Sequence, residues 1–308
     1  MPSPDFLNVP ALLERSQPRA RGGLMWFGLL AFVMVVLASA AVGGRSPAAA
    51  ALVRVFSMLT MLGLITGMAV MMALVVRRAR GEQQQLEAVE ELMQLRRWPQ
   101  AAAVLDFMLS RPTRSPAARV QGLIHLSRVL ARYDRYDDAI AVQNHLLDHV
   151  ALDAGTAHAL RLGRAMAMLR EDHLFDADRA IADLRRTVRG AAASAEADES
   201  PDQATRETDS AGLALIEIYR DVKTGHPAEA VELFERKLPV LRQQLGHRVG
   251  DAWALAARAY DLLGRPDDAR RAYENATLLT DPAELERRYP ETAPLSQKYP
   301  RAQAPPAA

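Results

Sequence analysis

The chain has 308 residues, no cysteine and a formal net charge of +1 at pH 7. The absence of cysteine excludes disulfides, a thiol nucleophile and every cysteine-ligated metal site, and the near-zero charge gives no general argument for binding nucleic acid. Aromatic residues make up only 6% of the sequence, which suits helices packed closely through small side chains.

Two long apolar runs near the N-terminus predict a transmembrane hairpin over residues 24–76. The first run, residues 24–42, has no charge and a single hydroxyl side chain, Ser39. The second, residues 55–76, has no charge and three hydroxyl side chains. At about 1.5 Å per residue, a helix of either length crosses a hydrocarbon core of roughly 30 Å. The lipid bilayer is therefore the first expected partner.

Arginines flank the predicted hairpin on its outer sides. Arg15, Arg19 and Arg21 precede the first run and Arg77, Arg78 and Arg80 come after the second, whereas the connection has only Arg45 and Arg54. This bias places both termini in the cytoplasm, so we expect a multi-pass protein of the cell (inner) membrane with residues 1–23 as a cytoplasmic tail. A cleaved signal peptide is the alternative, because residues 38–40 (Ala-Ser-Ala) resemble a processing site. The chain beyond the second run is cytoplasmic in either case.

Small residues four positions apart occur within both runs. Gly63 and Gly67 form a GxxxG step in the second run, and Ser39 and Gly43 form a similar step at the end of the first. Such steps let two helix backbones approach closely. The favoured interpretation is packing of the two spans against each other or the general abundance of glycine in membrane helices, and homo-oligomerisation through this face is the alternative.

Residues 77–288 are predicted to form a helical repeat domain, because apolar residues recur there at steps of three and four. The clearest unit runs from residue 253 to residue 281. Its spaced packing residues are Trp253, Ala257, Tyr260, Gly264, Ala269, Tyr273 and Ala276. This pattern of bulky and small residues resembles the tetratricopeptide repeat (TPR), in which paired helices close up through small side chains and a glycine relieves the turn between them.

Weaker copies of this unit precede it. They centre on Ala101, Ala139, Ala180 and Ala230, and the successive intervals up to Ala269 are 38, 41, 50 and 39 residues. The resemblance implies an all-α fold, a TPR-like α-solenoid of about five divergent helix pairs behind the hairpin. The order of a two-span anchor and cytoplasmic repeats also resembles HemY-type bacterial membrane proteins, in architecture only.

Two segments have a composition typical of disorder. Residues 190–210 contain six acidic residues, one arginine and almost no large apolar residue, so they cannot bury enough surface to order themselves. Residues 289–308 are rich in proline and alanine. We predict a disordered acidic loop within the repeats and a disordered tail after them.

The sequence offers little sign of catalysis. It lacks the glycine-rich phosphate loops, the GxSxG elbow and the HExxH helix. His145 and His149 lie one helical turn apart with Asp148 beside them, a spacing that suits zinc, but surface histidines are the favoured interpretation. We therefore expect no enzyme activity, no metal site and no cofactor.

Binding of other proteins is the activity that this architecture supports. A solenoid lines its concave side with the first helix of each pair. The residues expected to face this groove are Arg128, Glu217, Arg220, Arg258 and Asp261. The sequence predicts a membrane-anchored protein–protein interaction scaffold. The alternative is a component of a membrane transport or envelope-biogenesis machine whose spans contact substrate or channel subunits.

Overall fold

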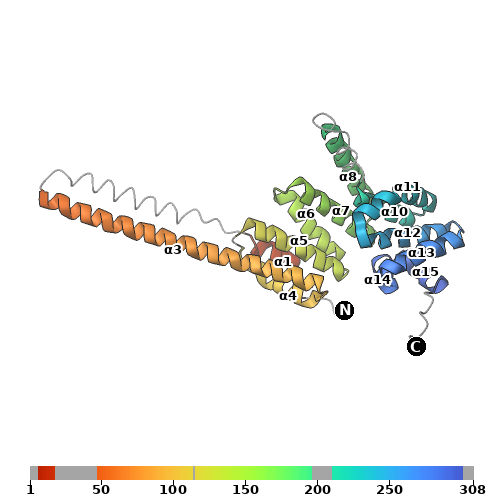
Figure 1. Ribbon diagram of the computed structural model, residues 1–308, viewed down its shortest axis with the longest axis horizontal. Coiled ribbons are helices and arrows are strands. Elements are labelled where there is room, and N and C mark those ends of the chain that lie inside the picture. Colours follow the sequence, from red (N-terminus) through yellow and green to blue (C-terminus); the bar gives the residue numbers. More distant parts are fainter. Residues whose placement is uncertain (1–5, 18–46, 114, 196–209, 301–308) are drawn as a thin grey trace. The chain divides into compact units, whose positions relative to one another are not determined.

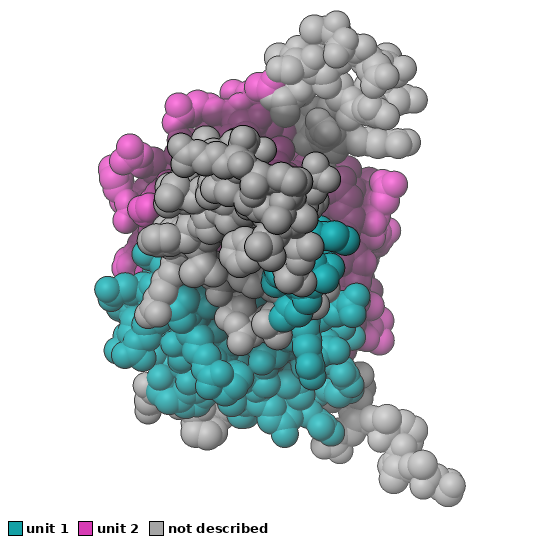
Figure 2. Space-filling view, turned by 90° about the vertical axis from the view of Figure 1, so that its left-hand side faces the viewer, with its two compact units in different colours: residues 1–133 teal, residues 134–308 magenta. Residues whose placement is uncertain are grey.

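The computed structural model describes residues 6–17, 47–113, 115–195 and 210–300 (Figure 1). The regular elements of this described part are all helices, which confirms the all-α class. The chain divides into two compact units, residues 1–133 and residues 134–308, which are coloured separately in Figure 2.

Unit 1 is built from helices that pack side by side. They are α1 (Val9–Arg15), α3 (Pro47–Gln94), α4 (Trp98–Leu109) and α5 (Pro116–Arg132). The C-terminal part of α3 packs against both α4 and α5, and α1 packs against α4. Leu86, Val89, Leu105 and Leu126 are almost fully buried in this core. Helix α5 begins where Ser115 caps it, its side chain accepting a hydrogen bond from the backbone N–H of Ala118 at 3.2 Å.

Helix α3 joins the second apolar run to the folded unit without a turn. It is 48 residues long, which corresponds to about 72 Å. Among the described residues, no helix has both the length and the apolar character needed to cross a membrane. The first predicted span, residues 24–42, lies outside the described residues, as do the side chains of more than half of residues 55–76.

Unit 2 is a stack of helices with one main hydrophobic core. The helices are α6 (Tyr136–His149), α7 (Ala154–Arg170), α8 (Leu174–Ala195), α10 (Ala211–Lys223), α11 (Pro227–Leu245), η1 (Gly246–Arg248), α12 (Val249–Leu262), α13 (Pro266–Leu279), α14 (Pro282–Arg288), η2 (Pro290–Thr292) and α15 (Ala293–Lys298). Helices adjacent in sequence pack as pairs, and α10 also packs against both α7 and α12. Helices α7, α10 and α12 therefore form a layer of their own.

The same turn precedes five helices in the described part of the chain. Arg96, Asp134, Asp172, Gly225 and Gly264 have φ angles of 58° to 77°, and each lies two residues before a helix begins. In four of these turns the next backbone N–H donates to the carbonyl five residues earlier at 2.8–2.9 Å. This bond is typical of a helix that ends in a left-handed residue. The turn therefore recurs at intervals of 38, 38, 53 and 39 residues.

A buried alanine follows each of these turns as the fourth residue of the helix. Ala101, Ala139, Ala230 and Ala269 occupy this position with 0% exposure. In α8 the equivalent residue is Ala177, also at 0%, rather than the Ala180 that the sequence pattern favoured. The predicted copy was thus three residues out of register, because α8 has alanines at both positions.

Two predictions of disorder need correction. Residues 289–300 are not a loose tail: they include η2 and α15, and Tyr289 and Leu295 are 0% exposed. Residues 301–308 lie outside the described residues. In the acidic segment, residues 190–195 continue α8 as helix, residues 196–209 lie outside the description, and Ser210 caps α10.

Candidate functional site

The residues of the clearest predicted repeat pack within α12 and α13. Ala257, Ala269 and Ala276 are 0% exposed, and Tyr260 and Tyr273 are 7% and 3% exposed. Trp253 is half-buried and meets the ring of Phe234 edge-on at 4.8 Å. Gly264 has the positive φ of the turn between the two helices. The buried side chains of this set pack in the core of unit 2, and Trp253 also links α12 to α11.

The five candidate groove residues are divided between the two units. Arg128 lies on α5 in unit 1 and is exposed, whereas the other four belong to unit 2. Glu217 and Arg220, on α10, point toward α8. Glu217 pairs with Arg185, and Arg220 pairs with Asp178 at 3.5 Å. These two ion pairs join α10 to its neighbour within the stack.

The remaining two candidates, Arg258 and Asp261 on α12, pair with each other at 3.1 Å. Asp261 also accepts hydrogen bonds from two residues of the chain's own C-terminal end, Lys298 and the hydroxyl of Tyr299 (3.3 Å). The Asp261 carboxylate is therefore already occupied by an intramolecular ligand.

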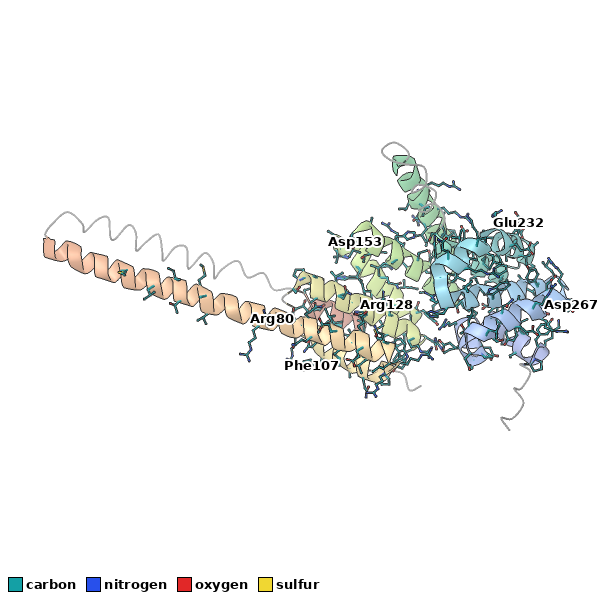
Figure 3. The ribbon with its side chains drawn as sticks, viewed as in Figure 1. Arg80, Phe107, Arg128, Asp153, Glu232 and Asp267 are labelled. Carbon is teal, nitrogen blue, oxygen red and sulfur yellow. The ribbon has the colours of Figure 1, made fainter. Side chains whose placement is uncertain are left out.

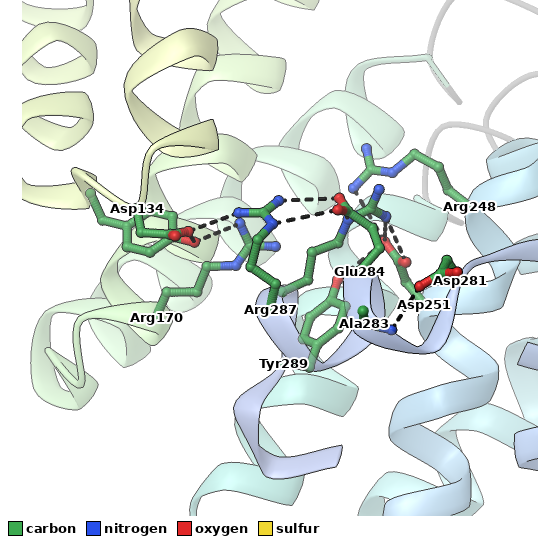
Figure 4. A network of polar contacts seen from close by, with 11 residues as sticks. Asp134, Arg170, Arg248, Asp251, Asp281, Ala283, Glu284, Arg287 and Tyr289 are labelled. Atoms are coloured by element: carbon green, nitrogen blue, oxygen red, sulfur yellow. Dashed lines mark hydrogen bonds and ion pairs between the residues drawn. The ribbon is translucent and has the colours of Figure 1, made fainter. Parts of the chain in front are cut away.

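The C-terminal segment, defined here as residues 287–299, makes further polar contacts of this kind (Figure 4). Arg288 donates to both carboxylate oxygens of Asp251 on α12, at 2.9 and 3.2 Å. The hydroxyl of Tyr289 donates to Asp251 at 3.3 Å. Arg287 donates to Asp134, at the start of unit 2, at 2.8 Å. Asp251 is 0% exposed, so its charge is compensated by the segment that covers it.

Aromatic contacts continue this interface over α7 and α10. The ring of Tyr289 meets Tyr219 edge-on at 5.0 Å, and the Arg170 guanidinium lies 5.5 Å from the ring of Tyr289. Tyr219 also bonds to Glu291 at 3.3 Å. Burial raises the pKa of both tyrosine hydroxyls well above the ordinary value, so both stay protonated and serve as donors.

These contacts show that the C-terminal segment covers one side of α7, α10 and α12. This interface was not predicted, because residues 289–308 as a whole are rich in proline and alanine. A usable signal was present in the spacing of Leu285, Tyr289, Leu295 and Tyr299, all of which are buried. They succeed one another at four, six and four residues, and the two steps of four match the period of a helix face.

The predicted histidine pair lies on the surface of α6. The rings of His145 and His149 stack with their centroids 4.9 Å apart, and Nδ1 of His149 faces the carbonyl oxygen of His145 at 3.2 Å. Over the described ranges, no three or more His, Cys, Asp or Glu side chains gather in a way that could hold a metal ion.

Unit 1 has an open apolar groove of about 570 Å³ between α3 and α4. It is lined by Gly81, Gln84, Gln85, Ala88, Ala103, Val104 and Phe107. Phe107 is 50% exposed, and Figure 3 shows its position on α4. Farther along α3, a Cβ placed on Gly63 or Gly67 would meet no described atom within 4 Å.

No known family model matches this sequence. A comparison with curated proteins also gave no match.

Proposed function

We propose that the chain is a membrane-anchored protein-binding scaffold. The observation that carries the anchor is the apolar surface of α3. Its described large side chains in the second run are Met58, Leu62, Ile65, Met68 and Val70, and they are 50–77% exposed. A contiguous apolar surface of this extent is unfavourable in water, whereas lipid chains would cover it.

The position of α1 supports a hairpin with an even number of crossings. Leu7, Val9 and Leu12 are 1–2% exposed within unit 1. Two polar contacts fix the end of α1: Thr113 donates to the carbonyl of Ser16 at 2.9 Å, and Arg119 donates to the hydroxyl of Ser16 at 3.0 Å. These contacts support the proposed topology, in which the chain lies on the same side of the membrane before residue 18 and after residue 80. A cleaved leader would remove α1 from this core, which argues against the signal-peptide alternative.

The recurrent turn supports a TPR-like solenoid. Each occurrence combines a left-handed residue, a new helix two residues later and a buried alanine on its first turn. Repeats of this kind stack on their neighbours and present long surfaces suited to binding proteins. The likeness to HemY-type proteins remains one of domain order.

Partner contact is proposed at the exposed side chains of the repeats, with Arg128 as the first candidate. Glu217, Arg220, Arg258 and Asp261 are tied by intramolecular ion pairs, so a partner would have to displace these contacts to bind there. Arg128 is exposed on α5 and is shown in Figure 3.

The test uses the full chain in isolated membranes. We expect it to resist alkaline extraction, as an integral protein does, and to co-purify with a partner after mild solubilisation. Arg128→Glu should abolish that co-purification, while Arg179→Glu, the same charge reversal at an exposed site on α8, should retain it. Release by alkali would refute the anchor. If the partner is lost only after substitutions in residues 55–76, the alternative function is favoured. In that case the chain is a component of a membrane transport or envelope-biogenesis machine, and its spans make the contacts.

A further inference from the structure

Three segments of unit 1 meet at one level of α3. The backbone N–H of Ser115 donates to Glu82 on α3 at 3.1 Å, which places the α4–α5 connection beside Glu82. The hydroxyl of Thr113, in the same connection, bonds to Ser16 at the end of α1. Glu82 lies six residues beyond Val76, the last residue of the uncharged run, or about 9 Å along the helix.

Exposed arginines come from each of these three segments. Arg15 lies in the last turn of α1, Arg77 and Arg80 lie on α3, and Arg111 lies in the α4–α5 connection; all four are exposed. None of them forms an ion pair with another residue of the described ranges. Of the acidic groups at this end, Glu82 is engaged by Ser115 and Glu14 is exposed. This end of unit 1, the four-arginine face, therefore carries excess positive charge.

An exposed aromatic ring adjoins the four-arginine face. The Arg111 guanidinium lies 4.2 Å above the ring centroid of Phe107, which is 50% exposed and lines the apolar groove between α3 and α4. A cation stacked on an aromatic ring beside an apolar groove presents both a charge and an apolar surface. This combination suits the boundary between lipid headgroups and water.

We propose that the four-arginine face binds the anionic phospholipid headgroups of the membrane in which the chain is anchored. This inference rests on the proposed membrane anchor. The headgroup layer extends about 5–8 Å beyond the hydrocarbon core on each side, and the field of anionic lipids decays over about 8 Å at physiological ionic strength. Arginines at the level of residues 77–82 lie within this range, and their long side chains shorten the distance further. Because the four-arginine face lies next to the end of the uncharged run, a lipid surface is favoured over a protein as its partner.

The absence of cysteine allows a single probe to report on this contact. Pro112→Cys, labelled with a fluorophore, places a probe between Arg111 and Thr113, and Gln94→Cys places a control probe on the same helix, about 18 Å farther from the membrane than Glu82. The labelled full chain is reconstituted into nanodiscs that carry a headgroup-attached quencher. One set contains phosphatidylcholine alone, and the other is a series with increasing fractions of phosphatidylglycerol.

We expect the residue-112 probe to be quenched in the anionic nanodiscs and much less in the neutral ones, with the difference falling as salt is added. Removing two charges with Arg80→Gln and Arg111→Gln should weaken the attraction to the anionic headgroups by about 30-fold. The anionic fraction needed for half-maximal quenching should therefore rise. The matched removal of Arg96 and Arg97, at the far end of the α3–α4 hairpin, should leave it unchanged.

Equal quenching in both lipids, or quenching that survives loss of Arg80 and Arg111, would overturn the inference, as would no quenching in either lipid. If the chain incorporates into the nanodiscs but the residue-112 probe stays unquenched, only the headgroup contact fails. If the chain does not incorporate at all, the membrane anchor fails and the inference falls with it.

Discussion

The contact between Asp251 and the C-terminal segment provides the sharpest test of the fold. The perturbation is Asp251→Ala. Asp251 is 0% exposed, and it holds Arg288 through two bonds and the hydroxyl of Tyr289 through a third. The substitution leaves a buried phenol without its acceptor and an arginine without its main counter-ion.

Breaking a buried ion pair from one side typically costs about 3–5 kcal/mol. The Arg288 side chain is 26% exposed and also bonds to Glu284 at 2.9 Å, so it can regain part of its solvation. We therefore expect a loss of about 2–3 kcal/mol, which corresponds to a fall in Tm of about 5–10 °C for a unit of this size. Tyr289→Phe removes only one hydroxyl bond, so it should cost about 1 kcal/mol.

The assay is thermal unfolding of the full chain in detergent, followed by circular dichroism, together with limited trypsin digestion. Asp251→Ala should speed cleavage after Arg287 and Lys298, because the C-terminal segment loses its main polar attachment. Asp268→Ala is the control, since Asp268 pairs with Arg265 and Arg271 on an exposed helix face and should change stability by less than about 1 kcal/mol. A Tm for Asp251→Ala within about 1 °C of the wild-type value, with unchanged cleavage, would refute this account of the interface.

Three further predictions, made with four substitutions, concern the helices of the repeats. Ala269→Leu should cost about 1–3 kcal/mol in thermal unfolding, because it adds methylenes to a fully packed position; an unchanged Tm would place Ala269 outside the helix contact. Gly264 and Arg96 both have positive φ, which is unfavourable for residues with a Cβ. Gly264→Ala should therefore lower the free energy of unfolding by about 1 kcal/mol, and Arg96→Gly should raise it by a similar amount. Effects of the same sign would argue against a shared turn conformation. Burial lowers the pKa of His125, so the unfolded chain takes up the proton first and stability should fall as the pH drops below about 6.5. In His125→Met the free energy of unfolding should change less with pH below about 6.5. If this variant keeps the pH dependence of the wild-type chain, another group causes it.

Helix positions could be predicted from the sequence because they depend on local features. The steps of three and four between apolar residues indicated the all-α class, and the alanines at 101, 139, 230 and 269 marked the starts of four helices. Gly225 and Gly264 mark two of the five turns, because glycine adopts positive φ readily. The other three turns use Arg96, Asp134 and Asp172, residue types that are far less specific for this conformation, so their turn geometry was not predicted.

The candidate groove shows what the sequence could not supply. Its five residues were chosen by their position in the repeat. That position predicts the helix face from which a side chain projects, but it does not predict which residues the side chain contacts. Only the tertiary structure shows that Glu217 and Arg220 point toward α8 and that Asp261 is held by the C-terminal segment.

The sequence by itself determined the uncharged run that we propose to lie in the membrane, the arginines beside it and the helical period of the repeats, because each depends on residues close together in the chain. The tertiary structure alone decided that α1 returns to α4 and α5 and that residues 287–299 cover α7, α10 and α12. These contacts join residues from about 40 to more than 150 positions apart. Burial of Leu12 or Tyr289 depends on which surface the chain meets after folding, and no local composition specifies that surface.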